Sequence, residues 1–415
     1  MSTRGEHLVH ADRRFSTGGG ILARLVSPAF TMVLDQIDER MACGGFDAIL
    51  PDGTMRRIGY RSAGPAAVVN LSSWLSLVRL ATSGSVGWYK AWTLGEWSSP
   101  DPVAIFELFS ANAVALGDVG RAKGPFRLMN ALAHRLRDNA PRKARKNIAA
   151  HYDLGNDFYS SWLDETMTYS SARFANRQMG LEGAQRRKVA LLLDRLDLRP
   201  GQRLLEIGCG WGSLAIAAAR RGVSVVGLTL SKEQKAWADR KIAEAGLSDR
   251  IEIRLQDYRD TADEFDAVAS VEMVEAVGQR WWPAYVDCIA RNLRPGGRAA
   301  LQFISMRDEL FDRYARNADF IQTYIFPGGM LLDELQFETL AREHGLSWED
   351  RDGFGLDYAE TLKRWRNRYN LAVARGDLAG FGEAFHNLWR YYLMYCEGGF
   401  RGGAIDVAQV TMVRN

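Results

Sequence analysis

Apolar and polar positions follow two alternating patterns from about residue 185 onward. Short apolar runs of strand length are separated by longer stretches in which apolar residues recur at helical spacing. The expected strands are Arg203–Ile207, Ser224–Leu228, Ile251–Leu255, Ala267–Val271 and Arg298–Ile304, and the expected helices include Lys232–Ala245 and Trp282–Leu293. This alternation predicts a parallel sheet that is covered by helices on both faces.

The alternation lapses between about residues 306 and 345. In this range, helical segments are interrupted by the string Tyr324-Ile-Phe-Pro-Gly-Gly329. An insertion near the carboxyl edge of a parallel sheet is a frequent place for a segment that covers the substrate. We therefore predict a helical cap from this part of the chain.

At 415 residues the chain is long for one domain, which favours two. The part before the sheet mixes helical and strand patterns and has a turn at Pro51-Asp-Gly53. The predicted divisions are a weakly ordered N-terminus at 1–30, a smaller, largely helical domain at 31–133, a basic linker at 134–150 and the sheet domain at 151–415.

A glycine-rich turn follows the first expected strand, in the string Leu204-Leu-Glu-Ile-Gly-Cys-Gly-Trp-Gly-Ser213. Glu206 lies at the end of the strand, and Gly208, Gly210 and Gly212 let the backbone turn tightly before a small-residue helix. Because no Gly-Lys-Ser/Thr and no fourth spaced glycine follow, neither a P-loop nor a full dinucleotide motif fits. The remaining E-x-G-x-G-x-G form is the one that Rossmann-like methyltransferases use for S-adenosyl-L-methionine. A purely structural turn is the alternative.

Polar residues at the ends of the next two strands are candidates for the rest of a cofactor site. The second strand lacks the acidic residue that holds ribose in nicotinamide-binding folds. Thr229 and Gln234 can still offer hydroxyl and amide groups to ribose, and Asp257 and Tyr258 are placed to contact an adenine. Each alone would be read as a surface polar residue, but their order around one predicted pocket favours cofactor binding.

The composition of the chain limits which classes of binding partner can be predicted for it. Hydrophobic residues at 47% and charged residues at 25% are those of an ordinary globular protein, and a net charge of +3 is too small to predict nucleic acid binding. A local basic cluster is formed by Arg135, Arg137, Arg142, Lys143, Arg145 and Lys146. Such a cluster attracts an anionic membrane surface, although a solvated linker has the same composition.

The four cysteines are widely spread, so no disulfide framework and no metal site is predicted, and a reducing cytoplasm suits them. The most apolar stretch, Ala66–Leu80, is interrupted by Asn70 and Arg79, so we expect neither a membrane span nor a signal peptide. The aromatic residues around Trp88 and Trp97 indicate a small aromatic core or, less commonly, a lipid interface.

Further strings occur in order along the chain: His151-Tyr-Asp-Leu-Gly-Asn-Asp157, Leu163-Asp-Glu-Thr-Met-Thr-Tyr-Ser-Ser171, Gly227-Leu-Thr-Leu-Ser-Lys-Glu-Gln234, Gln256-Asp-Tyr-Arg259, Tyr324-Ile-Phe-Pro-Gly-Gly329 and Phe354-Gly-Leu-Asp-Tyr358. With the glycine motif, they make residues 146–415 resemble the cyclopropane fatty acid synthase and mycolic acid cyclopropane synthase family of S-adenosylmethionine-dependent methyltransferases. The resemblance implies an α/β fold: a Rossmann-like class I methyltransferase sheet with a helical cap, preceded by a smaller mixed, largely helical N-terminal domain. It also implies that Tyr169 and Ser170 contact the cofactor.

By this resemblance the enzyme passes a methyl group to the double bond of an unsaturated acyl chain in a membrane phospholipid. An alkene is a poor nucleophile, so the reaction needs an aligned, dry site, and the carbocation it forms can be stabilised by aromatic faces. Tyr324, Phe326 and Tyr358 are the candidates. A base then removes a proton: loss from the transferred methyl closes a cyclopropane ring, and loss from a neighbouring carbon leaves a methyl-branched alkene.

The base is where this sequence departs from the cyclopropane-forming pattern. Those enzymes hold bicarbonate through a cysteine, a glutamate followed by histidine, a later histidine and a tyrosine. This chain has Ser171, Ala276 and Gln302 at the cysteine and the two histidine positions, and only Glu275 and Tyr358 remain. Ser171 and Gln302 can still donate hydrogen bonds to an anion, which leaves bicarbonate open as a cofactor.

Two additional carboxylates, Glu165 and Glu272, suggest a base within the protein. Glu272 and Glu275 are three residues apart and would share a face on a helical turn, where each raises the proton affinity of the other. We hypothesise that Glu165 or Glu272 replaces bicarbonate, giving a methyl-branched or methylene product. A cyclopropane synthase, a methyltransferase for a soluble acceptor, and a lipid-binding scaffold are the alternatives. We expect a cytoplasmic enzyme that is peripheral on the inner membrane face, and a homodimer is left open.

Overall fold

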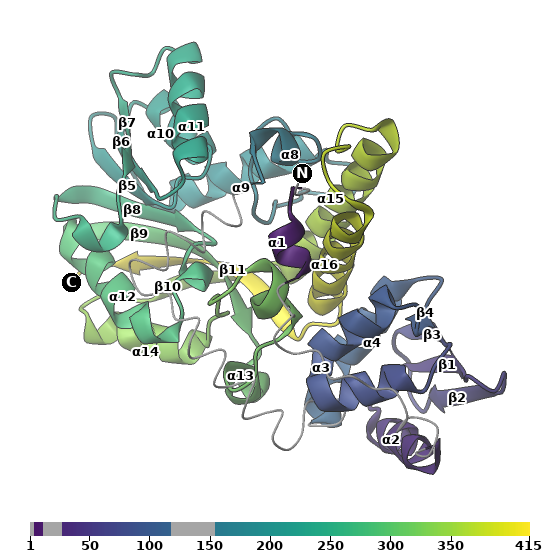
Figure 1. Cartoon of the computed structure of the whole chain (residues 1–415). Coiled ribbons are helices and arrows are strands. Elements are labelled where there is room, and N and C mark those ends of the chain that lie inside the picture. Colours follow the sequence, from purple (N-terminus) through teal and green to yellow (C-terminus); the bar gives the residue numbers. More distant parts are fainter. Residues whose placement is uncertain (1–3, 11–26, 118–153) are drawn as a thin grey trace. The chain divides into compact units, whose positions relative to one another are not determined.

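The computed structural model describes residues 4–10, 27–117 and 154–415 (Figure 1). The chain divides into two compact units that interleave along the sequence. The first comprises residues 1–137, 309–327 and 379–405, and the second comprises residues 138–308, 328–378 and 406–415. The basic cluster and most of the predicted weakly ordered N-terminus lie outside the described residues.

The second unit is built on a seven-stranded sheet in the order β10-β11-β9-β8-β5-β6-β7. Its strands are β5 (Arg203–Ile207), β6 (Ser224–Thr229), β7 (Ile251–Leu255), β8 (Phe265–Val271), β9 (Leu293–Met306), β10 (Glu349–Gly353) and β11 (Ile405–Val413). The five strands from β5 to β9 pair in parallel, whereas β10 and β11 pair antiparallel. The predicted parallel sheet is confirmed, and the antiparallel edge was not predicted.

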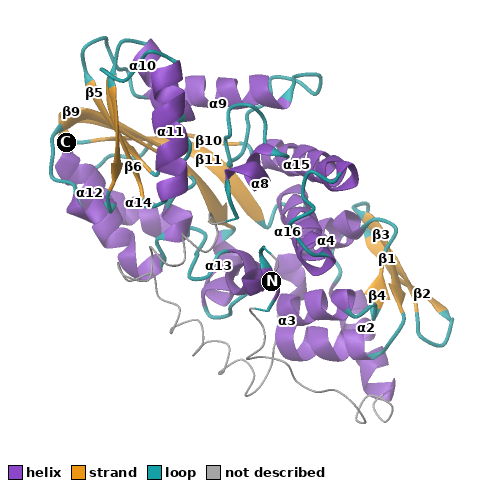
Figure 2. Ribbon diagram, turned by 45° about the horizontal axis from the view of Figure 1, so that its top comes forward, coloured by secondary structure: helices purple, strands orange, loops and turns teal. Residues whose placement is uncertain are grey.

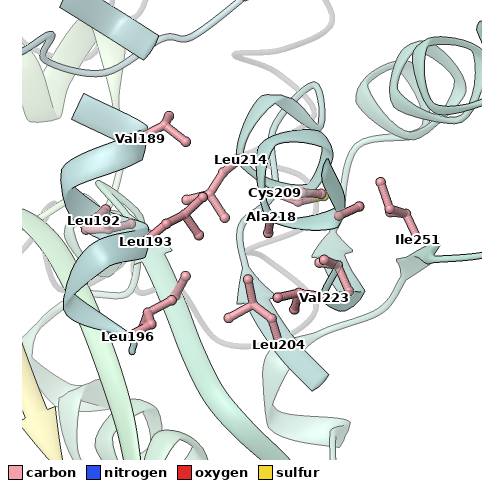
Figure 3. Close-up of a cluster of buried hydrophobic side chains, with 14 of the residues drawn as sticks. Val189, Leu192, Leu193, Leu196, Leu204, Cys209, Leu214, Ala218, Val223 and Ile251 are labelled. Carbon is pink, nitrogen blue, oxygen red and sulfur yellow. The ribbon is translucent and has the colours of Figure 1, made fainter. Parts of the chain in front are cut away.

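Helices cover both faces of this sheet (Figure 2). One face carries α9 (Leu181–Arg195), α10 (Ser213–Arg220) and α11 (Lys232–Glu244), and the other carries α12 (Trp282–Asn292) and α14 (Glu334–Glu343). Apolar side chains of α9 and α10 meet those of β5 in a buried cluster, in which Leu193 and Leu214 approach above Leu204 (Figure 3). The other helices of this unit are α8 (Asn156–Ser160) and α15 (Gly355–Arg375), with 3-10 turns at Tyr258–Asp260, Val274–Ala276 and Gln279–Trp281.

The first unit contains a four-stranded sheet in the order β2-β1-β3-β4. Its strands are β1 (Gly45–Ile49), β2 (Met55–Gly59), β3 (Ala66–Leu71) and β4 (Trp97–Ser98). Its helices are α1 (Glu6–Val9), α2 (Ser27–Arg40), α3 (Leu75–Thr93), α4 (Pro102–Ala111), α5 (Ala113–Leu116), α13 (Asp308–Ala315), a π-helix at Ile321–Ile325 and α16 (Glu383–Arg401). The predicted turn at Pro51–Gly53 is confirmed, since the Leu50 N–H donates to the Thr54 carbonyl across it at 2.8 Å.

Aromatic packing explains why distant segments join the first unit. Trp88 and Trp97 stack with ring centroids 4.4 Å apart, which confirms the aromatic-core interpretation of this region. The Tyr89 ring contacts Phe320, Tyr324 and Tyr391 at centroid distances of 4.8 to 4.9 Å. Residues 306–345 are therefore not one continuous cap: the π-helix belongs to the first unit, while α14 packs on α12 in the second. Within the described ranges, no helix has both the length and the apolarity that a membrane crossing requires.

Close packing in the middle of β6 yields a first prediction. A Cβ atom at Gly227 would lie 2.7 Å from Ile253 Cδ1 and 3.0 Å from Cys209 Cβ. We expect Gly227→Ala to lower the free energy of unfolding of the second unit by about 1–3 kcal/mol, because the core must shift to accept the methyl group. Gly183→Ala, in the first turn of α9 with its closest contact at 3.7 Å, serves as the control and should be neutral or slightly stabilising. Urea unfolding followed by circular dichroism measures both, and equal effects would contradict the packing argument.

Candidate functional site

A cavity of about 190 Å³ lies at the carboxyl ends of the central strands of the second unit. The chain runs outward from β5 to β6 on one side and to β8 on the other, so the strand order reverses beside β5. Ligands of open α/β sheets bind at such a reversal. The walls come from the loop at residues 167–170, the glycine turn after β5, the ends of β6 and β7 and the turn after β8.

Two glycines of the motif line this cavity for different reasons. At Gly210, with φ 53°, an added Cβ would meet no protein atom within 4 Å, so the bare backbone faces the space available to a ligand. At Gly208, with φ 83°, an added Cβ would lie 2.6 Å from Met273 Cγ, so that glycine makes room for a side chain. Gly212 does not line the cavity and precedes α10 as its cap residue.

The predicted ribose-binding residues meet at the end of β6. The Ser231 N–H donates to Thr229 Oγ1 at 3.1 Å, and the Thr229 hydroxyl donates to Gln234 Oε1 at 2.8 Å. Ser231 also caps α11 by accepting the Gln234 N–H through its Oγ. Because the Gln234 carbonyl oxygen accepts from Thr229, its amide N–H groups are available to the cavity. Thr229 therefore orients Gln234.

Asp257 and Tyr258 lie at the end of β7, as predicted, but with a neighbour that the sequence interpretation omitted. Arg259 donates to both Asp257 oxygens, at 2.9 Å to Oδ1 and 2.7 Å to Oδ2. The Asp257 carboxylate is thus largely engaged within the protein. Burial raises the pKa of Tyr258, whose hydroxyl has no hydrogen-bond partner among the described atoms. Tyr169 also lines the cavity and packs against the rings of Tyr159, Trp162 and Trp365.

Glu206 and Lys188 form a buried acid and base beside the glycine turn. Burial raises the pKa of Glu206 to about 8, against a main-chain hydrogen bond from Ala215 and the attraction of Lys188. Its Oε2 atom has no hydrogen-bond partner among the described atoms. Burial lowers the pKa of Lys188 to about 8, although Glu272, Asp164 and Glu206 all attract its charge. Lys188 Nζ donates to Ser170 Oγ at 2.6 Å.

Sequence interpretation missed Lys188. It lies on the inward face of α9, between the buried Ala184 and Leu192, and is itself fully buried. A lysine at a core position of an amphipathic helix was the signal that could have revealed it, because an unpaired charge is rarely buried.

The Glu272 carboxylate is the meeting point of the predicted catalytic residues. It accepts the Ser171 main-chain N–H at 2.9 Å and the Gln302 amide at 2.8 Å, both on Oε1, and the Tyr358 hydroxyl at 2.6 Å on Oε2. Burial raises the pKa of Glu272, while Lys188 and these three donors act to lower it. The Ser171 hydroxyl does not take part, since it donates to the Ala172 carbonyl.

The spacing of Glu272 and Glu275 predicted that they share a helical face, and this prediction is wrong. Glu275 nevertheless lies near Glu272. Glu272 adopts a left-handed backbone, with φ 48°, just before the 3-10 turn that contains Glu275. The carboxylates remain close enough to interact: burial and then the charge of Glu272 raise the pKa of Glu275 to about 8. Glu165 is exposed and does not line the cavity, so the structure does not bring it to this group.

The aromatic candidates for stabilising a cation are distributed between the units. Tyr358 belongs to the second unit, and Tyr324 and Phe326 belong to the first.

Comparison with known proteins shows which family the chain belongs to. Residues 139–410 match the family described as mycolic acid cyclopropane synthetase. The tuberculostearic acid methyltransferase UfaA1 of Mycobacterium tuberculosis is 40% identical over 347 residues, which cover 81% of this chain and 80% of the relative. The chain belongs to this family. The cyclopropane-fatty-acyl-phospholipid synthase of Escherichia coli is 36% identical over 351 residues, covering 81% of this chain and 85% of that protein.

A solved structure indicates the cofactor. The mycolic acid cyclopropane synthase CmaA1, complexed with SAH and CTAB, is 31% identical with a TM-score of 0.61, and the match covers 65% of this chain and 98% of that one. As a member of this family, the present chain is an S-adenosylmethionine-dependent methyltransferase, and S-adenosyl-L-methionine is its cofactor. The cavity suits that molecule: it offers bare backbone at Gly210, an amide at Gln234 and the unpartnered carboxylate oxygen of Glu206 for a cation.

The Glu206 carboxyl group yields a second prediction. With a pKa of about 8 it holds a proton at neutral pH, whereas a cationic ligand beside it favours the ionised form. Cofactor binding should therefore release a proton, and the affinity should rise with pH until about 8 and then level off. Calorimetry in buffers of different ionisation enthalpy counts that proton. Glu206→Gln should abolish the release and weaken binding roughly 10- to 100-fold, the value of a hydrogen bond to a charged group.

Glu275→Gln is the matched control for this measurement. Its carboxyl has a similar pKa of about 8, but it does not line the cavity, so that variant should still release the proton. Unchanged proton release by Glu206→Gln would assign the proton to another group.

Proposed function

We propose that this enzyme methylates the double bond of an unsaturated fatty acyl chain in a membrane phospholipid and that Glu272 then removes a proton from the product cation. The product is a methyl-branched or methylene fatty acyl chain. The names of the relatives support the class of substrate, since one is a tuberculostearic acid methyltransferase and another a cyclopropane-fatty-acyl-phospholipid synthase.

The bound cofactor supplies an electrophilic methyl group on a sulfonium. The alkene π electrons form the new carbon–carbon bond while the sulfur keeps the electrons of the broken bond, and the neighbouring chain carbon becomes a cation. Loss of a proton from an adjacent chain carbon returns its C–H electrons to a new double bond. A hydride shift before deprotonation at the added methyl gives the methylene isomer instead. Neither route needs an oxidant or a reductant.

The observation that carries the proposal is the set of donors around Glu272. In the cyclopropane-forming enzymes that this sequence resembles, the positions of Ser171, Gln302 and Tyr358 hold the bicarbonate ion. Here the same three positions donate hydrogen bonds to the Glu272 carboxylate. A protein carboxylate thus receives the donors that would otherwise hold a small carboxylate-like anion, which supports Glu272 as its replacement.

Glu272 also has the properties of a general base. A carboxylate has about four acceptor positions, and the three hydrogen bonds leave one for a proton. The residue lines the cofactor cavity, and burial raises its pKa, which strengthens it as a proton acceptor. Because Glu165 is exposed and outside the cavity, we assign the role to Glu272 alone.

Glu275 has a supporting place in this proposal. Its Oε1 accepts the Ile304 N–H at 2.5 Å, and its Oε2 has no hydrogen-bond partner among the described atoms. With a pKa of about 8, it is mainly protonated at neutral pH. A neutral Glu275 beside an ionised Glu272 avoids the repulsion between two buried carboxylates.

The decisive measurement is the structure of the lipid product. Because a cyclopropane and a methyl-branched or methylene alkene are isomers, we propose proton NMR of the fatty acids after incubation with oleoyl phospholipid vesicles and cofactor. Because unreacted oleoyl chains also have vinylic protons, the expected result is a new branch-methyl or exomethylene signal without upfield ring protons. Glu272→Gln should lower turnover by roughly 10²- to 10⁴-fold, the contribution of a general base, with cofactor affinity retained.

Glu165→Gln is the control and should turn over like the wild type. Glu272→Gly should recover part of its turnover with added bicarbonate, because the vacated donors can hold that ion and the left-handed backbone suits glycine. A cyclopropane from the wild type would refute the proposed product. Methyl transfer to an aqueous acceptor, with none to vesicles, would refute the lipid substrate.

We also propose that the enzyme is peripheral on the cytoplasmic face of the membrane and docks through the basic cluster at 135–146. This segment lies outside the described residues, so its composition alone supports the proposal. Replacing Lys143, Arg145 and Lys146 by Gln should weaken binding to anionic vesicles roughly 100-fold at low salt, since each basic residue contributes about 1 kcal/mol. Vesicle sedimentation measures this, and binding indifferent to salt and to anionic lipid would contradict it. A homodimer stays a prediction.

A further inference from the structure

Two buried glutamines on neighbouring strands form a hydrogen-bonded chain that ends at Glu272. Gln302 lies on β9 and Gln409 on β11, with 1% and 2% of their surfaces exposed. Gln409 Nε2 donates to Gln302 Oε1 at 3.0 Å and to the Lys188 carbonyl at 3.4 Å. Gln302 Nε2 in turn donates to Glu272 Oε1 at 2.8 Å and to the Ser171 carbonyl at 3.3 Å.

The direction of this chain is determined by its ends. The two ends of a glutamine amide have nearly the same shape, so hydrogen-bond partners decide which end points where. The main-chain carbonyls of Lys188 and Ser171 can only accept. Both amide nitrogens must therefore face these carbonyls, and the Gln302 oxygen must face the Gln409 nitrogen.

We propose that Gln409 is a positioning residue for the base: it holds the Gln302 amide so that its nitrogen, and not its oxygen, faces Glu272. The proposal rests on the proposed function, because it presumes that Glu272 removes the proton. Without the donor from Gln409, the Gln302 oxygen loses its partner, and only the Ser171 carbonyl and Glu272 still hold the amide in place. The amide N–H is then less firmly directed at Glu272, and a weaker hydrogen bond to the carboxylate disfavours the ionised base.

Among the other residues around Glu272, Gln409 forms a hydrogen bond only with the main-chain carbonyl of Lys188, and not with its amino group, within the described residues. Lys188 faces Glu272 from α9, Tyr358 from α15 and Glu275 from the following turn. Gln409 does not line the cofactor cavity. A substitution there should therefore change the proton affinity of the base while leaving cofactor binding in place.

The test is the pH dependence of kcat in four proteins: the wild type, Gln409→Met, Gln302→Met and the double variant. Methionine keeps the volume and removes the amide. The acid limb of kcat reports the pKa of the base in the enzyme–substrate complex. In Gln409→Met we expect this limb to move to higher pH, so that kcat on the acid limb falls roughly tenfold and recovers at alkaline pH.

The double variant separates positioning from general stabilisation. If Gln409 acts through Gln302, adding Gln409→Met to Gln302→Met should not shift the acid limb further. Thr411→Val is the matched control: Thr411 is also buried on β11, two residues along on the same side of the strand, and this change keeps its shape. Its acid limb should match that of the wild type. Thermal unfolding and calorimetry with the cofactor establish that each variant is folded.

Two results would overturn the proposal: an unmoved acid limb in Gln409→Met, or an equal further shift in the double variant. If Gln409→Met does not fold, Gln409→Leu carries the test, because leucine also lacks the amide that donates to Gln302. An acid limb that stays in place in that variant has the same meaning. Failure of the proposed function is read separately, from a cyclopropane in the wild-type lipid or from full turnover by Glu272→Gln.

Discussion

A carboxylate deep inside a protein must receive hydrogen bonds, and the site depends on how this requirement is met at Glu272. An unpaired buried charge costs several kcal/mol, so the ionised form exists only when its donors are in place. They come from the loop before α9, from β9 and from α15. These segments lie far apart in the sequence, from Ser171 to Tyr358, so the proposed base receives its donors only when the second unit has folded around it.

The need to stabilise buried carboxylates also explains why Lys188 is buried beside the cavity. Lys188 lies within electrostatic range of Glu206 on one side and of Glu272 on the other. One buried cation thus favours the ionised forms of both carboxylates. Glu206 lies beside the glycine turn, and Glu272 receives hydrogen bonds from Ser171, Gln302 and Tyr358. Its hydrogen bond to Ser170 ties this cation to the loop that contains Ser171, so charge and backbone position are linked.

The sheet and most of the cofactor site could be predicted because they depend on local patterns. The strands from β5 to β9 are apolar runs, and Gly210, Thr229 and Gln234 follow strand ends. The strand β10 could not be predicted, because Glu349–Gly353 is charged and mainly exposed and becomes a strand only by pairing with β11. The choice between Glu165 and Glu272 was also beyond the sequence. Asp164 is buried and Glu165 is exposed. A local turn, closed by the Met167 N–H on the Asp164 carbonyl, decides which of the two acidic side chains faces solvent, and residue type does not.

The left-handed backbone at Glu272 has a consequence for how this chemistry can change during evolution. A φ of 48° is unfavourable for most residues but readily adopted by glycine. The side chain at this position can therefore be gained or lost while the main chain and its donors stay where they are. If Glu272 is the base, as proposed, an enzyme that carries its own base and one that takes a base from solution could differ by a single codon, without a change in the main chain.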